Sequence, residues 1–456
     1  MNLLEIKPLT IICLRARRRE KMIRFDKNAW IVILFLIIFA IACPSQIFSK
    51  TTTTSKTHKA SHKAKTQDKS EKSQASQTTS GGLQCDSKSA VLMDGLTGQI
   101  LYEQKPDLRI APASFVKVMT LYVILDAIRA GQMKLDDMVT VSEKAWKRTY
   151  KTDSSSMFLK VGERVKVDDL LKGVAIASGN DACIALAEQL SGSEEAFVSK
   201  MNEKGKLLGL KDTQFRNPDG MPAEGQYTTA MDMATLAKRY IEDHPEALVY
   251  HSTVEFEYNG IHQENRNTLL QKNIGVDGLK TGHVQEAGYH LAATAKRDGQ
   301  RMIAVVMGCD KIRKRGPEAQ KLLDYGFKNY STVEAVKKGA SFGPLKVKRG
   351  KLNQVALVAA EAGWVTVGKG KENSVSAVPQ LPQSIVAPVR KGQVVAKVVV
   401  QKEGQVAKEV NLLASADVEK SLIPPWPILL GILCVLVIIV GFGLWWIRRP
   451  KTKKYI

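Results

Sequence analysis

Three short polar strings constrain what this 456-residue chain can fold into more than any other feature of it. Ser-Phe-Val-Lys occupies residues 114–117, Ser-Gly-Asn residues 178–180 and Lys-Thr-Gly residues 280–282. Each string alone is common, the first on solvated helix faces and the other two in turns and loops. Together and in this order they are rarely a coincidence, so we expect a fold that brings three distant segments to one site.

The first string contains a nucleophile and a base. Ser114 and Lys117 are three residues apart, so on a helix they share a face, and Pro112 suits the start of that helix. A serine hydroxyl is a weak nucleophile until a neighbour accepts its proton. A neutral Lys117 can accept it if burial and a second cation, for which Lys280 is the candidate, lower its pKa.

The other two strings provide the remaining groups of an acyl-transfer site. Ser178 can relay the proton toward the leaving amine, and Asn180 offers a peptide amide both a donor and an acceptor. Lys280 and Thr281 can hold a substrate carboxylate, and Gly282 leaves room for backbone beside the substrate. Backbone N–H groups near the nucleophile can stabilise an oxyanion. This chemistry needs no cofactor and no metal.

The middle of the chain has two consecutive regions with different residue patterns. Residues 83–331 mix strand and helix patterns: a hairpin around residues 94–99, helical periodicity over 165–190 and a buried strand over 301–308. Residues 332–416 consist of short β-rich stretches separated by Gly, Pro and Lys. We therefore predict an α+β catalytic domain followed by a small all-β domain.

Both ends of the chain indicate export. The uncharged run over residues 29–42 follows a basic stretch, and its 14 residues fit a secretory signal and are short for a membrane span. Ala40 and Ala42 supply small residues for cleavage before Cys43. An uncleaved anchor, lipidation of Cys43 and a true start at Met22 are the open alternatives.

The C-terminal end contains a longer apolar segment. Residues 428–447 are 20 residues without a charge, and as a helix they span about 30 Å, the thickness of the hydrocarbon core. Tryptophans lie at both ends of the segment, and residues 448–456 are basic. By the positive-inside rule this tail is cytoplasmic. We therefore predict an inner-membrane protein whose globular part is on the periplasmic side.

The charge and the cysteines narrow the class of protein further. The net charge of +22 is concentrated in residues 1–27, 50–82 and 448–456 rather than on a folded domain, so we predict no nucleic-acid partner. Residues 50–82 have almost no large apolar side chains, which predicts a disordered tether. The exported globule has an odd number of cysteines and no Cys-x-x-Cys, which indicates isolated buried thiols.

These observations divide the chain into seven parts. They are an export segment (1–42), a disordered basic Ser/Thr/Lys linker (43–82), a catalytic domain (83–331), a small β-rich domain (332–416), a Pro-containing link (417–427), a transmembrane helix (428–447) and a basic tail (448–456).

Further blocks of sequence, beyond the three strings, give the chain a family resemblance. They lie at residues 158–165, 215–221, 227–234, 258–260, 265–267, 275–283 and 287–289. With these blocks the chain resembles, over roughly residues 83–416, the low-molecular-mass penicillin-binding proteins that are serine-type D-alanyl-D-alanine carboxypeptidases. That family usually ends in a short amphipathic helix on the membrane, whereas this chain ends in a full span.

The resemblance implies an activity and a role for each site residue. Ser114 carries the acyl group, Lys117 accepts its proton, and Ser178 and Asn180 are second-string partners. Lys280 contacts substrate, and the backbone N–H groups of Ser114 and His283 form the oxyanion hole. The implied reaction removes the terminal D-alanine of peptidoglycan stem pentapeptides, and β-lactam antibiotics are covalent inhibitors.

The resemblance also implies a fold. It is the penicillin-binding/β-lactamase-like transpeptidase fold, in which helices cover an antiparallel sheet and a helical subdomain bears Ser178. A β-sandwich-like domain follows it.

Three alternative functions remain open at this point. A class A-type β-lactamase needs a glutamate that activates water, often as Glu-x-x-x-Asn. Glu255 and Asn259 have that spacing, but their alternating pattern favours a solvent-facing strand residue. A D,D-endopeptidase of the same superfamily shares the three strings. An inactive wall-binding scaffold is disfavoured because the polar residues of all three strings are intact.

Overall fold

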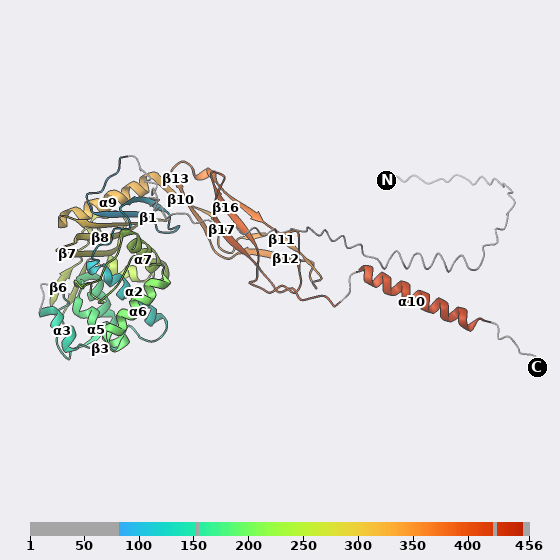
Figure 1. Ribbon diagram of the computed structural model, residues 1–456, viewed down its shortest axis with the longest axis horizontal. Coiled ribbons are helices and arrows are strands. Elements are labelled where there is room, and N and C mark those ends of the chain that lie inside the picture. Colours follow the sequence, from blue (N-terminus) through green and yellow to red (C-terminus); the bar gives the residue numbers. More distant parts are fainter. Residues whose placement is uncertain (1–81, 151–154, 423–425, 450–456) are drawn as a thin grey trace, which may run out of the picture. The chain divides into compact units, whose positions relative to one another are not determined.

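The structure is a computed structural model that describes residues 82–150, 155–422 and 426–449 (Figure 1). The predicted export segment, its cleavage site and nearly all of the predicted linker lie outside the described residues, as do residues 450–456 of the predicted tail.

A five-stranded antiparallel sheet in the order β2-β1-β9-β8-β7 is the frame of the catalytic part. Its strands are β1 (Ser89–Asp94), β2 (Ile100–Gln104), β7 (Val276–Val284), β8 (Gly288–Arg297) and β9 (Gln300–Cys309). The predicted hairpin is confirmed as β1 and β2, and the predicted buried strand as β9, the centre of the sheet.

Helices cover both faces of this sheet. Alternate side chains of β9 point to opposite faces, so Ile303, Val305 and Met307 pack with helices α2 (Val116–Arg129) and α7 (Ala230–Asp243). Met302, Ala304 and Val306 pack with α9 (Ile312–Asn329), which contributes Ala319, Leu322 and Leu323 at helical spacing (Figure 1). A strand buried on both faces reads as a continuous apolar run, which is why the sequence pattern identified β9.

A helical subdomain carries the second string. Its elements are β3 (Met138–Thr140), α3 (Glu143–Tyr150), β4 (Arg164–Lys166), α4 (Val167–Lys172), the π-helical turn η2 (Gly173–Ala177), α5 (Asn180–Ser191) and α6 (Glu194–Leu207). The prediction of one helical pattern over residues 165–190 is therefore wrong in two places. Val165 lies in strand β4, and the helix breaks at Ser178, whose left-handed φ of 61° ends the π-helical turn.

The remaining elements of the catalytic part are short. They are η1 (Ala113–Phe115), α8 (Ala247–Ser252), the hairpin of β5 (Glu255–Tyr258) and β6 (Ile261–Glu264), and η3 (Leu270–Lys272).

The C-terminal part is built almost entirely from strands. A six-stranded sheet has the order β14-β16-β17-β12-β11-β15, and β10 pairs with β13. The bounds are β10 (Tyr330–Val336), β11 (Ser341–Lys348), β12 (Gln354–Ala359), β13 (Gly363–Gly368), η4 (Glu372–Ser374), β14 (Val375–Gln380), β15 (Ile385–Val386), β16 (Val394–Lys402) and β17 (Gln405–Ala414). Its core is rich in valine, as the β-rich pattern led us to expect.

One helix of the described residues, α10 (Trp426–Ile447), is long and apolar enough to cross a membrane. It has 22 residues and a mean hydropathy of 2.9, and none of that apolar stretch is buried within the protein. A helix with this composition and no protein covering is typical of a membrane anchor.

Candidate active site

The predicted nucleophile, Ser114, lies where a short turn becomes a helix. Ser114 sits in η1, which Pro112 precedes, and η1 continues directly into α2, where Lys117 lies. The Lys117 Nζ is 3.1 Å from the Ser114 Oγ. The predicted shared helical face of these two residues is therefore present.

The second string, which lies in the helical subdomain, contacts Ser114 and Lys117. The Ser178 hydroxyl donates to the Ser114 Oγ at 3.2 Å. Asn180 begins α5, and its Oδ1 accepts from the Lys117 Nζ at 2.7 Å. The left-handed backbone of Ser178 is strained for a residue with a side chain. Such strain is often retained where it aims a functional group, and here the hydroxyl is aimed at Ser114.

Lys117 is fully buried among three oxygen atoms. Besides Ser114 and Asn180, its Nζ contacts the backbone oxygen of Asp219. Burial lowers the pKa of Lys117, since the charged amine is separated from water. A neutral amine has two hydrogens and one lone pair. The Asn180 Oδ1 and the Asp219 oxygen can only accept, so in the neutral form both hydrogens can go there and the lone pair can face the Ser114 hydroxyl; in the charged form the third hydrogen is donated to the Ser114 Oγ.

The lowered pKa of Lys117 has the expected main cause, burial, but a different second cation. Burial is the main cause for Lys117, and Arg266 is the cation that lowers its pKa further, while Cys183, Asp219 and Asp181 oppose the shift. The repulsion between the two lysines is evident at Lys280. Its pKa lies well below the usual value because of burial first and Lys117 second. Lys280 is thus a smaller influence on Lys117 than the sequence suggested.

The third string lies on β7, an edge strand of the sheet, beside the nucleophile. Lys280 and Thr281 are buried on this strand. A methyl group on Gly282 would lie 3.3 Å from the Ala113 Cβ and 3.3 Å from the His290 Cδ2. The glycine therefore makes room for the turn that carries Ser114, in addition to the predicted room for substrate.

A polar cleft of about 450 Å³ opens over these groups. It is lined by Ser114, Ser155, Ser178, Asn180, Asp219, Gly220, Met221, Pro222, Arg266, Thr281, Gly282, His283, Val284, Gln285, Glu286 and Arg315. Six of the eight predicted site residues line it, whereas Lys117 and Lys280 are buried at 0% and 3% exposure. The two lysines are thus covered by the residues that line the cleft, and Lys280 is next to the lining residue Thr281 on β7.

Two arginines of the cleft were not assigned to the site from the sequence. The Arg266 Nη1 donates to the Ser155 Oγ at 2.5 Å, and the Arg315 Nη2 donates to the backbone oxygen of Arg266 at 3.1 Å. Burial, followed by repulsion from Arg266, lowers the pKa of Arg315 to about 10. The two cations give one side of the cleft a positive charge suited to an anion. Arg266 lies within one of the family-like blocks, but Arg315 belongs to a basic run that is typical of a solvated helix face.

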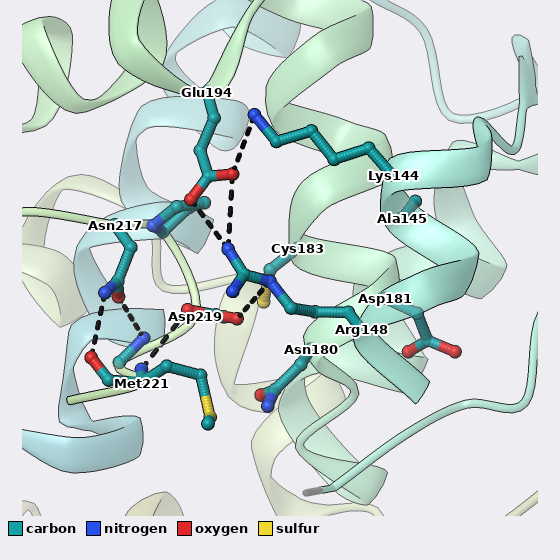
Figure 2. A network of polar contacts seen from close by, with 12 residues as sticks. Lys144, Ala145, Arg148, Asn180, Asp181, Cys183, Glu194, Asn217, Asp219 and Met221 are labelled. Carbon is teal, nitrogen blue, oxygen red and sulfur yellow. Dashed lines mark hydrogen bonds and ion pairs between the residues drawn. The ribbon is translucent and has the colours of Figure 1, made fainter. Parts of the chain in front are cut away.

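Residues 217–221, which form neither helix nor strand, supply the third acceptor for Lys117, the Asp219 backbone oxygen. In this segment the Asn217 Oδ1 accepts from the Gly220 N–H at 2.7 Å, and the Asn217 Nδ2 donates to the Met221 oxygen at 2.8 Å (Figure 2). Gly220 has a φ of +83° and lies directly against the Ala113 carbonyl. The segment is thereby held to the nucleophile turn, with the Asp219 oxygen facing Lys117.

A larger and more apolar hollow of about 790 Å³ lies elsewhere in the catalytic part. Leu125, Ile176, Tyr250 and Glu255 are among its lining residues, and none of the predicted site residues lines it. The Glu255 side chain is 63% exposed on strand β5, as expected for a solvent-facing strand residue. This position is unsuited to a glutamate that activates water for a Ser114 acyl group.

The chain matches two family models. Residues 72–311 match the model described as D-alanyl-D-alanine carboxypeptidase, and residues 330–420 match the model described as penicillin-binding protein 5, C-terminal domain. The chain therefore belongs to the family of serine-type D-alanyl-D-alanine carboxypeptidases, the low-molecular-mass penicillin-binding proteins.

Individual relatives agree over most of the chain. It is 43% identical to the D-alanyl-D-alanine carboxypeptidase DacC of Escherichia coli over 339 residues, which are 74% of this chain and 85% of that protein. It is 40% identical to DacF of Bacillus subtilis over 350 residues, 74% of this chain and 87% of the relative.

Solved structures share the fold. Penicillin-binding protein 5 from Haemophilus influenzae matches with a TM-score of 0.69 and 41% identity, over 75% of this chain and 99% of that one. Penicillin-binding protein 6B from Escherichia coli matches with a TM-score of 0.62 and 36% identity, over 73% and 97%. The predicted family, fold class and enzyme class are confirmed.

Proposed function

We propose that Ser114 is the nucleophile of this D,D-carboxypeptidase and that Lys117 is its proton acceptor. The observation that supports this most strongly is the environment of the Lys117 amine. It is buried, its pKa is lowered, and both of its hydrogens are directed to obligate acceptors. The Lys117 Nζ lies 3.1 Å from the Ser114 Oγ, so the lone pair that remains on the neutral amine can accept the Ser114 proton.

The reaction proceeds through an acyl-enzyme. The Ser114 Oγ attacks the carbonyl carbon of the penultimate D-alanine of a peptidoglycan stem pentapeptide while its proton passes to Lys117. The backbone N–H groups of Ser114 and His283 stabilise the oxyanion. When the peptide bond breaks, Ser178 relays a proton to the departing D-alanine amine. Water then hydrolyses the ester and regenerates Ser114. A β-lactam acylates the same oxygen.

The terminal carboxylate of the substrate gives the reaction its specificity. Lys280 and Thr281 bind this carboxylate, and Asn180, Gly282 and His283 line the substrate beside it. Arg266 supplies a further cation that lines the cleft. An anion bound here favours the charged form of Lys280, whose pKa is otherwise lowered by burial.

Two substitutions test the assignment of the nucleophile and the base. Ser114→Ala should abolish both covalent labelling by a fluorescent penicillin and the release of D-alanine from a pentapeptide. Lys117→Ala should slow acylation severely in a protein that still unfolds cooperatively. Persistent labelling of the Ser114→Ala protein would contradict the assignment. Product analysis on a cross-linked muropeptide separates carboxypeptidase from endopeptidase activity.

We also propose the location and the division of the chain. The helix α10 anchors the protein in the inner membrane, with residues 448–456 in the cytoplasm and the catalytic part in the periplasm. Residues 83–331 form the catalytic domain and 332–416 the β-rich domain, which the two family matches support. Protease added to spheroplasts should digest the catalytic part. Protection until the membrane is broken would contradict this topology.

A further inference from the structure

Figure 2 shows a network of charged side chains that joins α3 and Glu194 to Asp219 in the segment 217–221. Arg148, on α3, donates from its Nη2 to the Glu194 Oε1 at 2.9 Å and lies 3.3 Å from the Glu194 Oε2. The Arg148 Nε also lies 3.3 Å from the Asp219 Oδ2, in an ion pair without the alignment of a hydrogen bond. Arg148 therefore lies between two carboxylates from different parts of the fold.

The two carboxylates differ in their access to water. The Asp219 side chain is completely buried, the Glu194 side chain is 10% exposed and the Arg148 side chain is 29% exposed. A buried carboxylate is costly unless a cation or donors compensate for its lost hydration. For Asp219, the Met221 N–H donates to Oδ1 at 3.2 Å, and Arg148 is the cation at Oδ2.

Asp219 links this network to the catalytic amine. Its backbone oxygen accepts from the Lys117 Nζ, while its carboxylate contacts Arg148. The same residue thus connects to Lys117 through its main chain and to Arg148 through its side chain. A backbone shift that carries Asp219 away from Arg148 would therefore also move the carbonyl that contacts the Lys117 amine.

The charge of Asp219 works against catalysis unless it is compensated. A nearby carboxylate favours the protonated form of Lys117, and a protonated Lys117 cannot accept the Ser114 proton. The guanidinium of Arg148 offsets this negative charge, because it is always protonated near neutral pH.

We propose that Arg148 is a positioning residue for Lys117. It holds the Asp219 carboxylate so that the Asp219 carbonyl stays directed at the Lys117 amine, and it offsets the Asp219 charge so that the amine stays neutral. Glu194 orients Arg148 in turn. This proposal rests on the roles proposed above for Ser114 and Lys117.

The charged and titratable groups around Lys117 come from several elements. Cys183 and Asp181 face Lys117 from α5, Arg266 from the segment after β6, and Lys280 from β7. Of the groups named here, Asp219 is the one that Arg148 contacts. A substitution at Arg148 therefore tests the coupling through Asp219 and leaves the other charges in place.

The test measures the rate constant of acylation by a fluorescent penicillin as a function of pH, in the full-length protein. In Arg148→Met the acid limb of the profile should move to higher pH by roughly 0.5–1 unit, because the uncompensated Asp219 charge raises the pKa of Lys117. At neutral pH the rate should fall about three- to tenfold. Arg148→Lys should restore part of the loss, because it keeps the charge and loses the planar fork.

Two controls test whether the shift of the acid limb depends on the charge of Asp219. Lys147→Gln removes a cation from the same helix whose partner is the exposed Glu143, so its profile should match wild type. In an Asp219→Asn background, Arg148→Met should no longer move the acid limb, since the charge that it uncovers has gone. A shift of equal size in that background would overturn the proposal.

The remaining outcomes separate this proposal from the one on which it rests. If Ser114→Ala is still labelled, the proposed function fails. If Ser114→Ala is unlabelled and the Arg148→Met profile coincides with wild type, the role of Arg148 is overturned. A loss that is equal at every pH, with an unmoved acid limb, would also overturn it, because it would show that Arg148 only stabilises the fold.

Discussion

The sharpest steric prediction concerns Gly220, which lies against the nucleophile turn. A Cβ at this position would be 2.0 Å from the Ala113 carbonyl oxygen, 2.5 Å from the Ala113 carbon and 3.0 Å from the Ser114 nitrogen. These neighbours are backbone atoms, so no side chain can rotate to relieve the overlap. In Gly220→Ala the turn and the 217–221 segment must therefore move apart, by about 1 Å or more to reach an ordinary contact.

The expected losses follow from this displacement. The φ of +83° costs an alanine roughly 1 kcal/mol, and the overlap adds roughly 1–3 kcal/mol. We expect the free energy of unfolding to fall by about 2–4 kcal/mol. Acylation should slow about a hundredfold, because a displacement of about 1 Å at a reacting group has a cost of this size.

Gly209 provides a matched control. Its φ is +77°, and a Cβ there would have no neighbour within 4 Å. Gly209→Ala should cost about 1 kcal/mol of stability from the backbone alone and leave acylation unchanged. Chemical denaturation and fluorescent-penicillin labelling measure the two effects. If Gly220→Ala acylates within about threefold of wild type, the argument from sterics to catalysis is wrong.

Three further predictions follow from the site and the anchor. Lys280→Ala should lower kcat/KM on a pentapeptide about ten- to a hundredfold, because charge-assisted hydrogen bonds are worth roughly 1.5–3 kcal/mol. It should also remove most of the preference for the free acid over its C-terminal amide. Equal wild-type rates on acid and amide would refute carboxylate recognition. His290 accepts from the Gly308 N–H at 2.9 Å, and burial lowers its pKa from 6.5 to about 4, so it contributes stability above pH 6.5 that is lost as the pH falls toward 4. Urea unfolding should show wild type losing about 1.5 kcal/mol more than His290→Asn between about pH 6.5 and pH 5. An equal loss in both proteins would refute the assignment. Truncation before Trp426 should transfer an active enzyme from the membrane fraction to the soluble fraction, and its retention in the membrane fraction would show that α10 is not the anchor.

Local patterns in the sequence were sufficient where a feature depends on neighbouring residues. The β1–β2 hairpin follows from two apolar stretches around a turn, and β9 follows from a short apolar run, because both patterns reflect burial that each strand needs by itself. The same holds for α10, whose apolar length is a property of one continuous segment.

The break at Ser178 shows where local patterns fail. The apolar residues on either side continue one helical period, because both helices face the same core. What interrupts them is the left-handed conformation of Ser178, which aims its hydroxyl at the Ser114 Oγ. That conformation is strained, and the surrounding fold must maintain it.

The sequence by itself predicted the polar groups of the three strings, since the chemistry of a serine nucleophile demands particular residue types at three places in the chain. Only the tertiary structure decided how those groups are tuned. The Asp219 oxygen that contacts the Lys117 amine is a backbone atom, and any residue type carries one. Arg148 lies in a charged helix whose other basic residues, Lys144 and Lys147, are more exposed than it is, and the sequence pattern does not separate the three. Burial and distance distinguish it, and these are set by contacts between residues far apart in the chain.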